Sequence, residues 1–293
     1  ISNKNISIVL PCVKLEQNKF PWIGYLFDFQ HEYLPQFFTK DEIILRKKTM
    51  KDILFNCKHV FTNSKKTKLD AKKFFGDFPA EIHVVPYSPC IDLDLLNFNE
   101  DVIKKYNLKN EYFIICNQFW RHKNHETAIL AYSEYVNKGG KNDLILTGNT
   151  FDKRFPEHFE NIKKLISKLN LNNKVKILGL VSKKTQIALL KNARALIQPS
   201  LFEGGPGGGS CRDAISLDLE IFASDIEINR EINCGRIEYF EPLKPESLLN
   251  LFLKSDEIFY KKKDIHTLTK EGEKRKIECG KFLLNTIEKA INI

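Results

Sequence analysis

The chain has little of what marks membrane, disulfide-rich and zinc-finger proteins. In its 293 residues, no apolar run approaches the roughly 18 uncharged residues of a membrane-spanning helix. Its seven cysteines form an odd, scattered set without a C-x-x-C pair. That pattern argues against a disulfide framework and a zinc site, and it favours a reducing compartment. The first residues contain no methionine and show no signal-peptide pattern.

Positive charge is in excess. The 46 Lys and Arg residues outnumber the 37 Asp and Glu residues, so the net charge is +9. An anionic partner is therefore expected: a phosphorylated substrate, an anionic lipid or nucleic acid. The densest lysine runs, Lys65–Lys73 and Lys261–Lys263, are typical of solvated helix faces, and docking on a membrane surface is the second interpretation. Nucleic acid ranks last, because no recognition motif is present.

The length suggests two domains. From Glu111 onward, strand-like and helix-like segments alternate, which predicts an α/β fold with a parallel sheet and right-handed crossovers. The expected strands are 112–116, 143–146, 175–180 and 195–198, and the expected helices are 125–136, 159–169 and 185–193.

The first part of the chain shows the same rhythm in shorter form. Strands are expected at 6–10, 23–27, 59–62 and 82–85, with helices at 41–55 and 65–75. We expect a partial first Rossmann-like domain over 1–106, including much of a linker at 92–109. A second Rossmann-like domain should cover 107–279, and an amphipathic tail should cover 280–293.

The most informative segment is Gln198–Asp213. A predicted strand enters it, an apolar-patterned segment leaves it, and between them stand Glu203 and a cluster of glycines. Glycines allow close backbone approach to a ligand, and the N–H groups at a helix start favour an anion. Ser210 and Asp213 also match a capping box, so Asp213 has a purely structural alternative. The predicted phosphate-binding residues are Gly204, Gly205, Gly207, Gly208, Gly209 and Ser210.

Two stretches here carry a family resemblance. Pro199-Ser-Leu-Phe-Glu-Gly and Ala223-Ser-Asp-Ile-Glu-Ile-Asn-Arg-Glu resemble signature segments of the group 1 (family 4) retaining glycosyltransferases. The resemblance implies a GT-B fold, in which two Rossmann-like domains face a central cleft. It also implies that Glu203 holds the donor sugar. Asp213 reaches the ribose-binding position if a two-residue insertion is allowed, whereas Asp218 and Glu220 depart from the usual Gly and Pro.

The resemblance extends to the loop after the first strand of the second domain. Asn117-Gln-Phe-Trp-Arg-His-Lys resembles the segment whose Arg and Lys grip the donor diphosphate. Lys123 falls on the Lys position, Gln118 on the Arg position, and Arg121 is close enough to replace it. The base is expected near the ends of the next strands, at Gly148 and at Leu180 and Val181.

In the first domain, the resemblance implies a His that faces the donor, for which His31 is the candidate, with Asp28 orienting its ring. Because such a domain normally begins with further βα units, we expect them to be missing or the domain to be unusually small. The resemblance also implies that the tail packs back on this domain. Asp92-Leu-Asp94 looks like a metal motif but lies in the linker, and no other His, Asp or Glu cluster has metal-ligand spacing.

We therefore expect metal-independent, retaining transfer from a nucleotide-diphosphate sugar to an acceptor hydroxyl, without a cofactor. The acceptor is expected to be a saccharide or lipid-linked, in bacterial surface polysaccharide or glycolipid synthesis. The expected location is the cytoplasm or the inner membrane face, with no nucleic acid partner. A GT-B sugar-nucleotide epimerase and a catalytically weak partner subunit of a glycosyltransferase stay open as alternatives.

Overall fold

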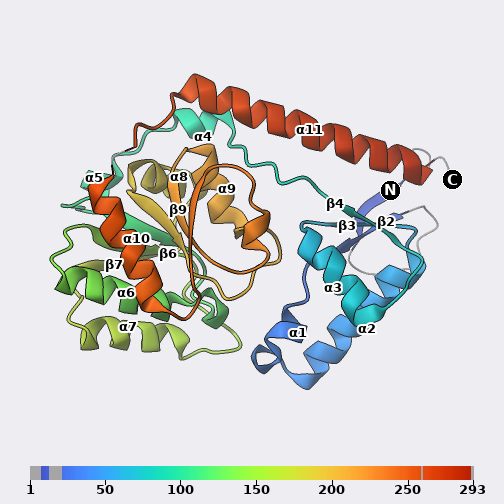
Figure 1. Cartoon of the computed structure of the whole chain (residues 1–293), viewed down its shortest axis with the longest axis horizontal. Helices are drawn as coiled ribbons and strands as arrows, with labels where there is room; N and C mark the ends of the chain where they lie inside the picture. The colour runs from blue at the N-terminus through green and yellow to red at the C-terminus, as the bar shows by residue number, and fades with distance from the viewer. Residues whose placement is uncertain (1–7, 13–21, 259, 292–293) are drawn as a thin grey trace. The chain divides into compact units, whose positions relative to one another are not determined.

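The computed structural model describes residues 8–12, 22–258 and 260–291. The chain divides into two compact units. The first contains the residues up to Ser88, the short segment Glu203–Pro206 and the chain from Lys274 on. The second contains Pro89–Phe202 and Gly207–Glu273. Figure 1 colours the chain from the N-terminus to the C-terminus and labels elements of both units where there is room.

The first unit is built on four parallel strands in the order β1-β2-β3-β4. Residue 6, where the first strand was expected to begin, lies outside the described residues. The strands are β1 (Val9–Cys12), β2 (Trp22–Leu26), β3 (His59–Thr62) and β4 (Glu81–Val84). The helices are α1 (Gln30–Tyr33), η2 (Pro35–Phe37), α2 (Lys40–Asn56) and α3 (Lys65–Phe75).

Local signals explain where these helices begin. Thr39 starts α2 with a capping box: its hydroxyl accepts from the backbone N–H of Glu42, whose carboxylate accepts from the Thr39 N–H. Ser64 caps α3 in the same way, by accepting from the Thr67 N–H.

The sheet of the first unit buries both faces. Val60 packs in a core with residues of α2 such as Ile53 and Leu54. Its neighbour Phe61 faces the other way, into a cluster with Ala290 of the long helix α11 (Ile265–Ile291). Alternate residues of a strand point to opposite faces, so helices are needed on both sides of the sheet.

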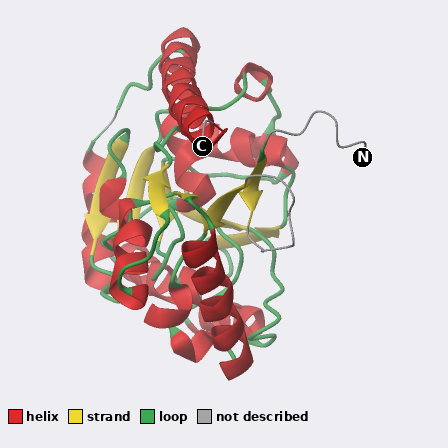
Figure 2. Ribbon diagram, turned by 90° about the vertical axis from the view of Figure 1, so that its right-hand side faces the viewer, coloured by secondary structure: helices red, strands yellow, loops and turns green. Residues whose placement is uncertain are grey.

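The second unit has six parallel strands in the order β10-β9-β8-β5-β6-β7. They are β5 (Tyr112–Cys116), β6 (Asp143–Thr147), β7 (Val175–Gly179), β8 (Ala195–Gln198), β9 (Glu220–Ser224) and β10 (Arg236–Phe240). The longer helices are α6 (His125–Asn137), α7 (His158–Lys168), α8 (Lys183–Asn192), α9 (Gly208–Ser216) and α10 (Pro245–Glu257), coloured red in Figure 2. Short helices are α4 (Leu93–Asn97), α5 (Val102–Lys105), η3 (Arg121–Lys123) and η4 (Asn229–Glu231).

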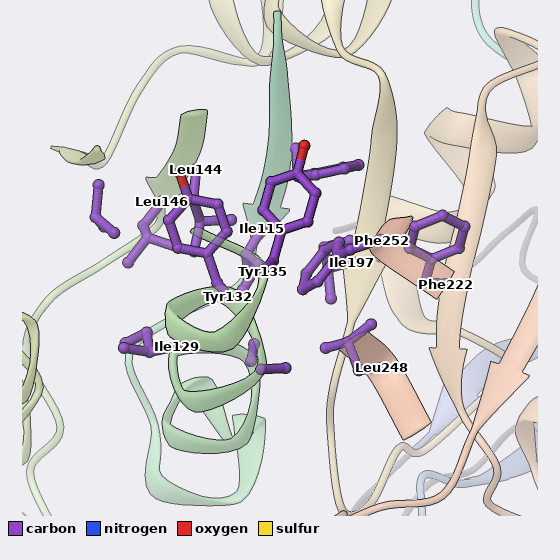
Figure 3. Close-up of a cluster of buried hydrophobic side chains, with 14 of the residues drawn as sticks. Ile115, Ile129, Tyr132, Tyr135, Leu144, Leu146, Ile197, Phe222, Leu248 and Phe252 are labelled. Atoms are coloured by element: carbon purple, nitrogen blue, oxygen red, sulfur yellow. The ribbon is translucent and has the colours of Figure 1, made fainter. Parts of the chain in front are cut away.

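Aromatic residues pack together with aliphatic ones in the core between this sheet and the helices α6 and α10. Figure 3 shows Tyr132 and Tyr135 of α6 and Phe252 of α10 beside side chains of four strands, among them Phe222. The Phe252 ring lies 4.6 Å from that of Phe113, centroid to centroid. Such packing fixes the strand ends that carry the loops described below.

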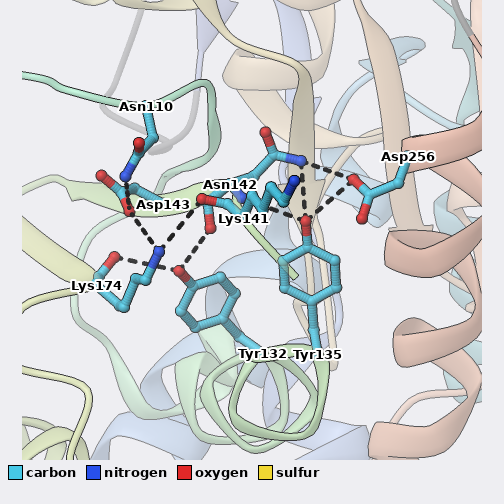
Figure 4. A network of polar contacts seen from close by, with 8 residues as sticks. All are labelled: Asn110, Tyr132, Tyr135, Lys141, Asn142, Asp143, Lys174 and Asp256. Carbon is cyan, nitrogen blue, oxygen red and sulfur yellow. Dashed lines mark hydrogen bonds and ion pairs between the residues drawn. The ribbon is translucent and has the colours of Figure 1, made fainter. Parts of the chain in front are cut away.

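The side chains of Tyr132 and Tyr135 also place their hydroxyl groups in this core, and each hydroxyl forms hydrogen bonds (Figure 4). The Tyr132 hydroxyl donates to the carbonyl of Asn142 at 2.8 Å. The Tyr135 hydroxyl donates to the Asp256 carboxylate at 3.0 Å and accepts from the Asn142 side-chain amide at 2.9 Å. Burial raises the pKa of Tyr135 to about 12, so it stays a neutral donor.

The expected α/β class with parallel strands is confirmed. Strands β3, β5 and β8 have the predicted bounds, as does helix α3. The expected linker 92–109 contains the short helices α4 and α5. Within the described ranges, no helix is both long and apolar enough to cross a bilayer.

Candidate functional site

The six-stranded sheet has one point where its strand order reverses, between β5 and β8. In an open parallel sheet, the crevice outside the carboxyl ends at this point is the usual ligand site. Asn117 follows β5 and Gln198 ends β8, and the Asn117 amide donates to Gln198 Oε1 at 2.7 Å. The site begins with this buried amide pair.

The amide pair holds the glycine loop that follows β8. Gln198 Nε2 donates to the carbonyl of Gly207 at 3.0 Å. The Gly207 N–H donates to Oδ1 of Asn229 at 3.0 Å, and the Asn229 amide donates to the Ser224 carbonyl. Gln198 and Asn229, which are 1% and 0% exposed, had not been predicted as site residues. For Gln198 the available signal was its place at the end of β8, whereas Asn229 begins the short helix η4, after the end of β9.

The glycine loop runs directly into helix α9. Gly207 has a φ of 63° and a Cβ there would lie 2.5 Å from the Cβ of Cys211, so both backbone and space require glycine. The helix begins at Gly208, with no side chain capping it. A Cβ at Gly209 would meet nothing within 4 Å. The first-turn N–H groups of α9 are therefore not covered by a capping side chain, as an anion site needs.

The predicted capping box at Ser210 and Asp213 is wrong, because α9 starts before Ser210 and its N-cap residue is Gly207. Asp213 instead accepts from Lys183 Nζ and, at 3.3 Å, from Gln186 Nε2. Burial raises the pKa of Asp213, and the ammonium of Lys183 counteracts that shift. The carboxylate thus joins α9 to α8, and Lys183 is a cation that the sequence did not single out.

A second loop lies against the glycine loop. The Leu201 N–H donates to the carbonyl of His122 at 2.8 Å, and the Asn124 amide donates to the carbonyl of Pro199 at 3.1 Å. Asn124 adopts a φ of 53°, which asparagine tolerates, and η3 ends there. Two segments some 75 residues apart in the sequence therefore meet at one edge of the sheet.

This second loop carries the predicted cations. Lys123 is only 8% exposed, while Arg121 is exposed and its guanidinium carbon lies 5.1 Å from the centre of the Phe155 ring. Burial is the main cause that lowers the pKa of His122 and of His125 to about 3 each. Both imidazoles are therefore neutral, and the positive charge of this loop comes from Lys123 and Arg121.

The loops after β6 and β7 complete this edge. The Gly148 N–H donates to the carbonyl of Gly179 at 2.8 Å, and the Phe119 N–H donates to that of Asn149 at 2.9 Å. A Cβ at Gly148 would lie 1.9 Å from the carbonyl oxygen of Asn117. Of the predicted residues, Gln118 follows the end of β5, whereas Leu180 and Val181 follow the end of β7, and Leu180 is 78% exposed.

The remaining predicted residues belong to the first unit. Glu203 is 7% exposed, and together with Gly204, Gly205 and Pro206 it belongs to that unit's segment Glu203–Pro206. His31 is 1% exposed in α1, the short helix that follows β2.

We expected Asp28 to orient the ring of His31. In the structure, Arg46 stands between the two side chains. The Asp28 carboxylate accepts from Arg46 at 2.6 Å, and Arg46 Nε donates to His31 Nδ1 at 3.2 Å. Burial and then the Arg46 charge lower the pKa of His31, so its ring is neutral, with the proton on Nε2. That atom is buried without a hydrogen-bond partner, and the Glu32 carboxylate is 3.6 Å away.

Asp218 and Glu220, the two departures from the family pattern, lie at the opposite edge of the second sheet. Glu220 begins β9, and its carboxylate lies 3.5 Å from Arg194; Asp218 pairs with Arg236 at 3.4 Å. Asp218 also has a φ of 53°, a conformation that glycine adopts easily. Both carboxylates therefore pair with arginines at the amino edge and lie away from the candidate site.

Asp92 precedes α4 without capping it through its side chain. In ranges 8–12, 22–258 and 260–291, neither Asp92 nor Asp94 belongs to a cluster of three metal-ligating side chains.

Comparison with known proteins shows the family and the fold. The profile of the family described as glycosyl transferases group 1 matches residues 98–252. An uncharacterised glycosyltransferase of Methanocaldococcus jannaschii is 27% identical over 182 residues, which are 61% of this chain and 42% of that protein. The chain thus spans less than half the length of this curated relative.

Solved structures with similar folds are glycosyltransferases. Sucrose-phosphate synthase of Thermosynechococcus elongatus superposes with a TM-score of 0.66 at 19% identity, over 88% of this chain and 63% of that one. HepE of Anabaena, in a complex with UDP and glucose, gives 0.66 at 14% identity, over 93% and 71%. These neighbours have the GT-B fold, and the likeness confirms that fold class here.

Proposed function

Because this chain belongs to the group 1 glycosyl transferases, we propose that it moves a sugar from a nucleotide-diphosphate sugar to an acceptor hydroxyl, with retention of configuration. One observation carries the proposal. The loop with buried Lys123 is hydrogen-bonded to the glycine loop that opens α9, at the reversal point of the sheet. Cations and uncapped N–H groups together suit a diphosphate.

In this proposal, each group has a separate task. The first-turn N–H groups of α9 receive the diphosphate, and Lys123 and Arg121 balance the negative charge that grows on it as it departs. Glu203 hydrogen-bonds hydroxyls of the donor sugar. The ribose lies near Asp213, and the base lies near the ends of β6 and β7.

The proposed chemistry is a single displacement on one face of the sugar. The bond between the anomeric carbon and the diphosphate oxygen breaks while the acceptor oxygen bonds to that carbon from the same side. A diphosphate oxygen takes the proton of the acceptor hydroxyl. Arg121, Lys123 and the N-terminus of α9 stabilise the negative charge on the leaving group. The proposed mechanism therefore uses no metal ion.

The acceptor is proposed to be a saccharide or a lipid-linked saccharide of a bacterial surface polysaccharide or glycolipid, made at the cytoplasmic side of the membrane. Helix α3 supports this proposal, because it exposes Lys65, Lys68 and Lys72 together with the apolar Leu69. Such a face suits an anionic lipid surface. Co-sedimentation with anionic vesicles, but not with neutral ones, is the expected result.

The experiment that tests the function starts with a thermal-shift screen of UDP-, GDP- and ADP-sugars. A bound donor raises Tm by mass action. For the donor that does so, release of free nucleoside diphosphate is measured with Glu203→Gln and with Glu160→Gln, an exposed control on α7. The proposal predicts that only Glu203→Gln loses most turnover while nucleotide affinity is kept. Failure of every donor to bind would refute it, and isomerised sugar nucleotide would indicate an epimerase.

A further inference from the structure

Three metal-ligating side chains converge on two neighbouring strands of the first unit, outside the site described above. His59 begins β3, and Glu81 and His83 stand two residues apart on β4. The parallel register pairs His59 with Glu81 and Phe61 with His83. Because alternate residues of a strand share a face, all three side chains project from one face of the sheet.

Their ligand atoms form a compact triangle. His59 Nδ1 lies 3.0 Å from His83 Nε2, and the Glu81 carboxylate oxygen lies 3.6 Å from the first nitrogen and 3.8 Å from the second. Ligands at about 2.0–2.1 Å from a tetrahedral ion are separated by roughly 3.3 Å. The triangle therefore has the dimensions of one face of such a tetrahedron.

We propose that His59, Glu81 and His83 bind a divalent transition-metal ion of the zinc class, with water as the fourth ligand. Two imidazoles and one carboxylate suit zinc better than magnesium or calcium, which prefer oxygen ligands. Glu81 is 60% exposed in its side chain, so an ion reaches the triangle from solvent.

The position of the triangle assigns the ion a structural role. It lies at the amino ends of β3 and β4, whereas Asp28 and His31 follow the carboxyl end of β2. Phe61, between the ligands on the same face, packs against Phe282 and near Ala290 of α11. The ion would tie β4, the edge strand, to β3 beneath the end of α11, and it would take no part in sugar transfer.

This cluster was not singled out from the sequence. His59 and Glu81 are 22 positions apart, and only the register of two parallel strands brings them together. A search for metal-ligand spacing finds ligands that are close in the sequence. It does not find a pair such as His59 and Glu81, which lie on two different strands.

The test is a titration of tag-free, metal-stripped protein with ZnCl₂, followed by calorimetry and by thermal shift. Cobalt(II) is used in parallel, because its visible absorption reports tetrahedral coordination. The variants are Glu81→Gln and His83→Gln, with His266→Gln as an exposed histidine control on α11. We expect one zinc ion per chain and a rise in Tm. Each ligand variant should weaken binding by at least about tenfold, since loss even of a supporting residue costs that much.

The control should bind like the wild type. Absence of zinc binding, or equal binding by wild type and Glu81→Gln, would overturn the proposal. Should His83→Gln fail to fold, Glu81→Gln decides alone, because its side chain is largely exposed. The test measures metal binding and thermal stability, so its result does not depend on whether the protein transfers a sugar.

Discussion

Replacing Gly148 by alanine tests how tightly the loops of the candidate site are packed. Gly148 has a φ of 143°, and a Cβ there would lie 1.9 Å from the Asn117 carbonyl oxygen and 2.5 Å from its carbon. These are backbone atoms at the end of a central strand, so they cannot swing away as a side chain would. The clash must push the loop after β5 away from the loop after β6.

The cost has two parts. Alanine in a sparsely populated backbone region costs about 1–3 kcal/mol, and overpacking costs about another 1–3 kcal/mol. Gly148→Ala should therefore lower the free energy of unfolding of the second unit by about 2–6 kcal/mol. The displaced Asn117 also holds Gln198, which holds Gly207, so nucleoside-diphosphate affinity should fall as well.

Gly139→Ala is the matched control. Gly139 also has a positive φ, 89°, but a Cβ there would meet nothing within 4 Å. It should show only the backbone cost, roughly 1–2 kcal/mol, with unchanged nucleotide affinity. Denaturant unfolding and calorimetric titration with the nucleoside diphosphate measure both quantities. If Gly148→Ala matched Gly139→Ala in both, the close approach of the two loops would be refuted.

Three further outcomes are expected. Tyr135→Phe should cost about 1–3 kcal/mol of stability in denaturant unfolding, because Asn142 and Asp256 lose a buried partner, and a wild-type value would contradict that role. Initial transfer rates measured well below Tm should be unchanged in excess EDTA, whereas abolition by chelator with rescue by manganese would place an ion in the donor site. Arg121→Ala should weaken nucleoside-diphosphate binding if Arg121 serves the diphosphate, and wild-type affinity would assign that task to Gln118 or another group.

Most elements of the second unit from β5 to β8 were predictable because local patterns and burial agree there, whereas no prediction was made for β9, β10 or α10. Strand β5 is a short apolar run, and β8 is a short buried run that ends in the polar Gln198, so their bounds follow from where the apolar runs end. The pairing of the two site loops followed from the rule that parallel strands end at one edge.

What escaped prediction depends on partners distant in the sequence. Ser210 and Asp213 match the sequence pattern of a capping box, but α9 begins earlier, at glycines with positive φ. The carboxylate of Asp213 instead accepts a hydrogen bond from Lys183, 30 residues earlier in the chain. Arg46 reaches Asp28 and His31 from another helix. Each of these contacts is set by packing, which spacing along one chain segment does not encode.

The central claim is that the diphosphate of a nucleoside diphosphate binds where the loop that carries Lys123 lies beside the N-terminus of α9. The most direct test is the dissociation constant of the nucleoside diphosphate, measured by calorimetry for the wild type and for Lys123→Ala. A charge-assisted bond contributes about 1.5–3 kcal/mol, so the variant should bind roughly tenfold or more weakly. Its single-turnover rate should fall further, because the charge on the diphosphate grows in the transition state. Equal affinity and equal rate in the two proteins would contradict the account.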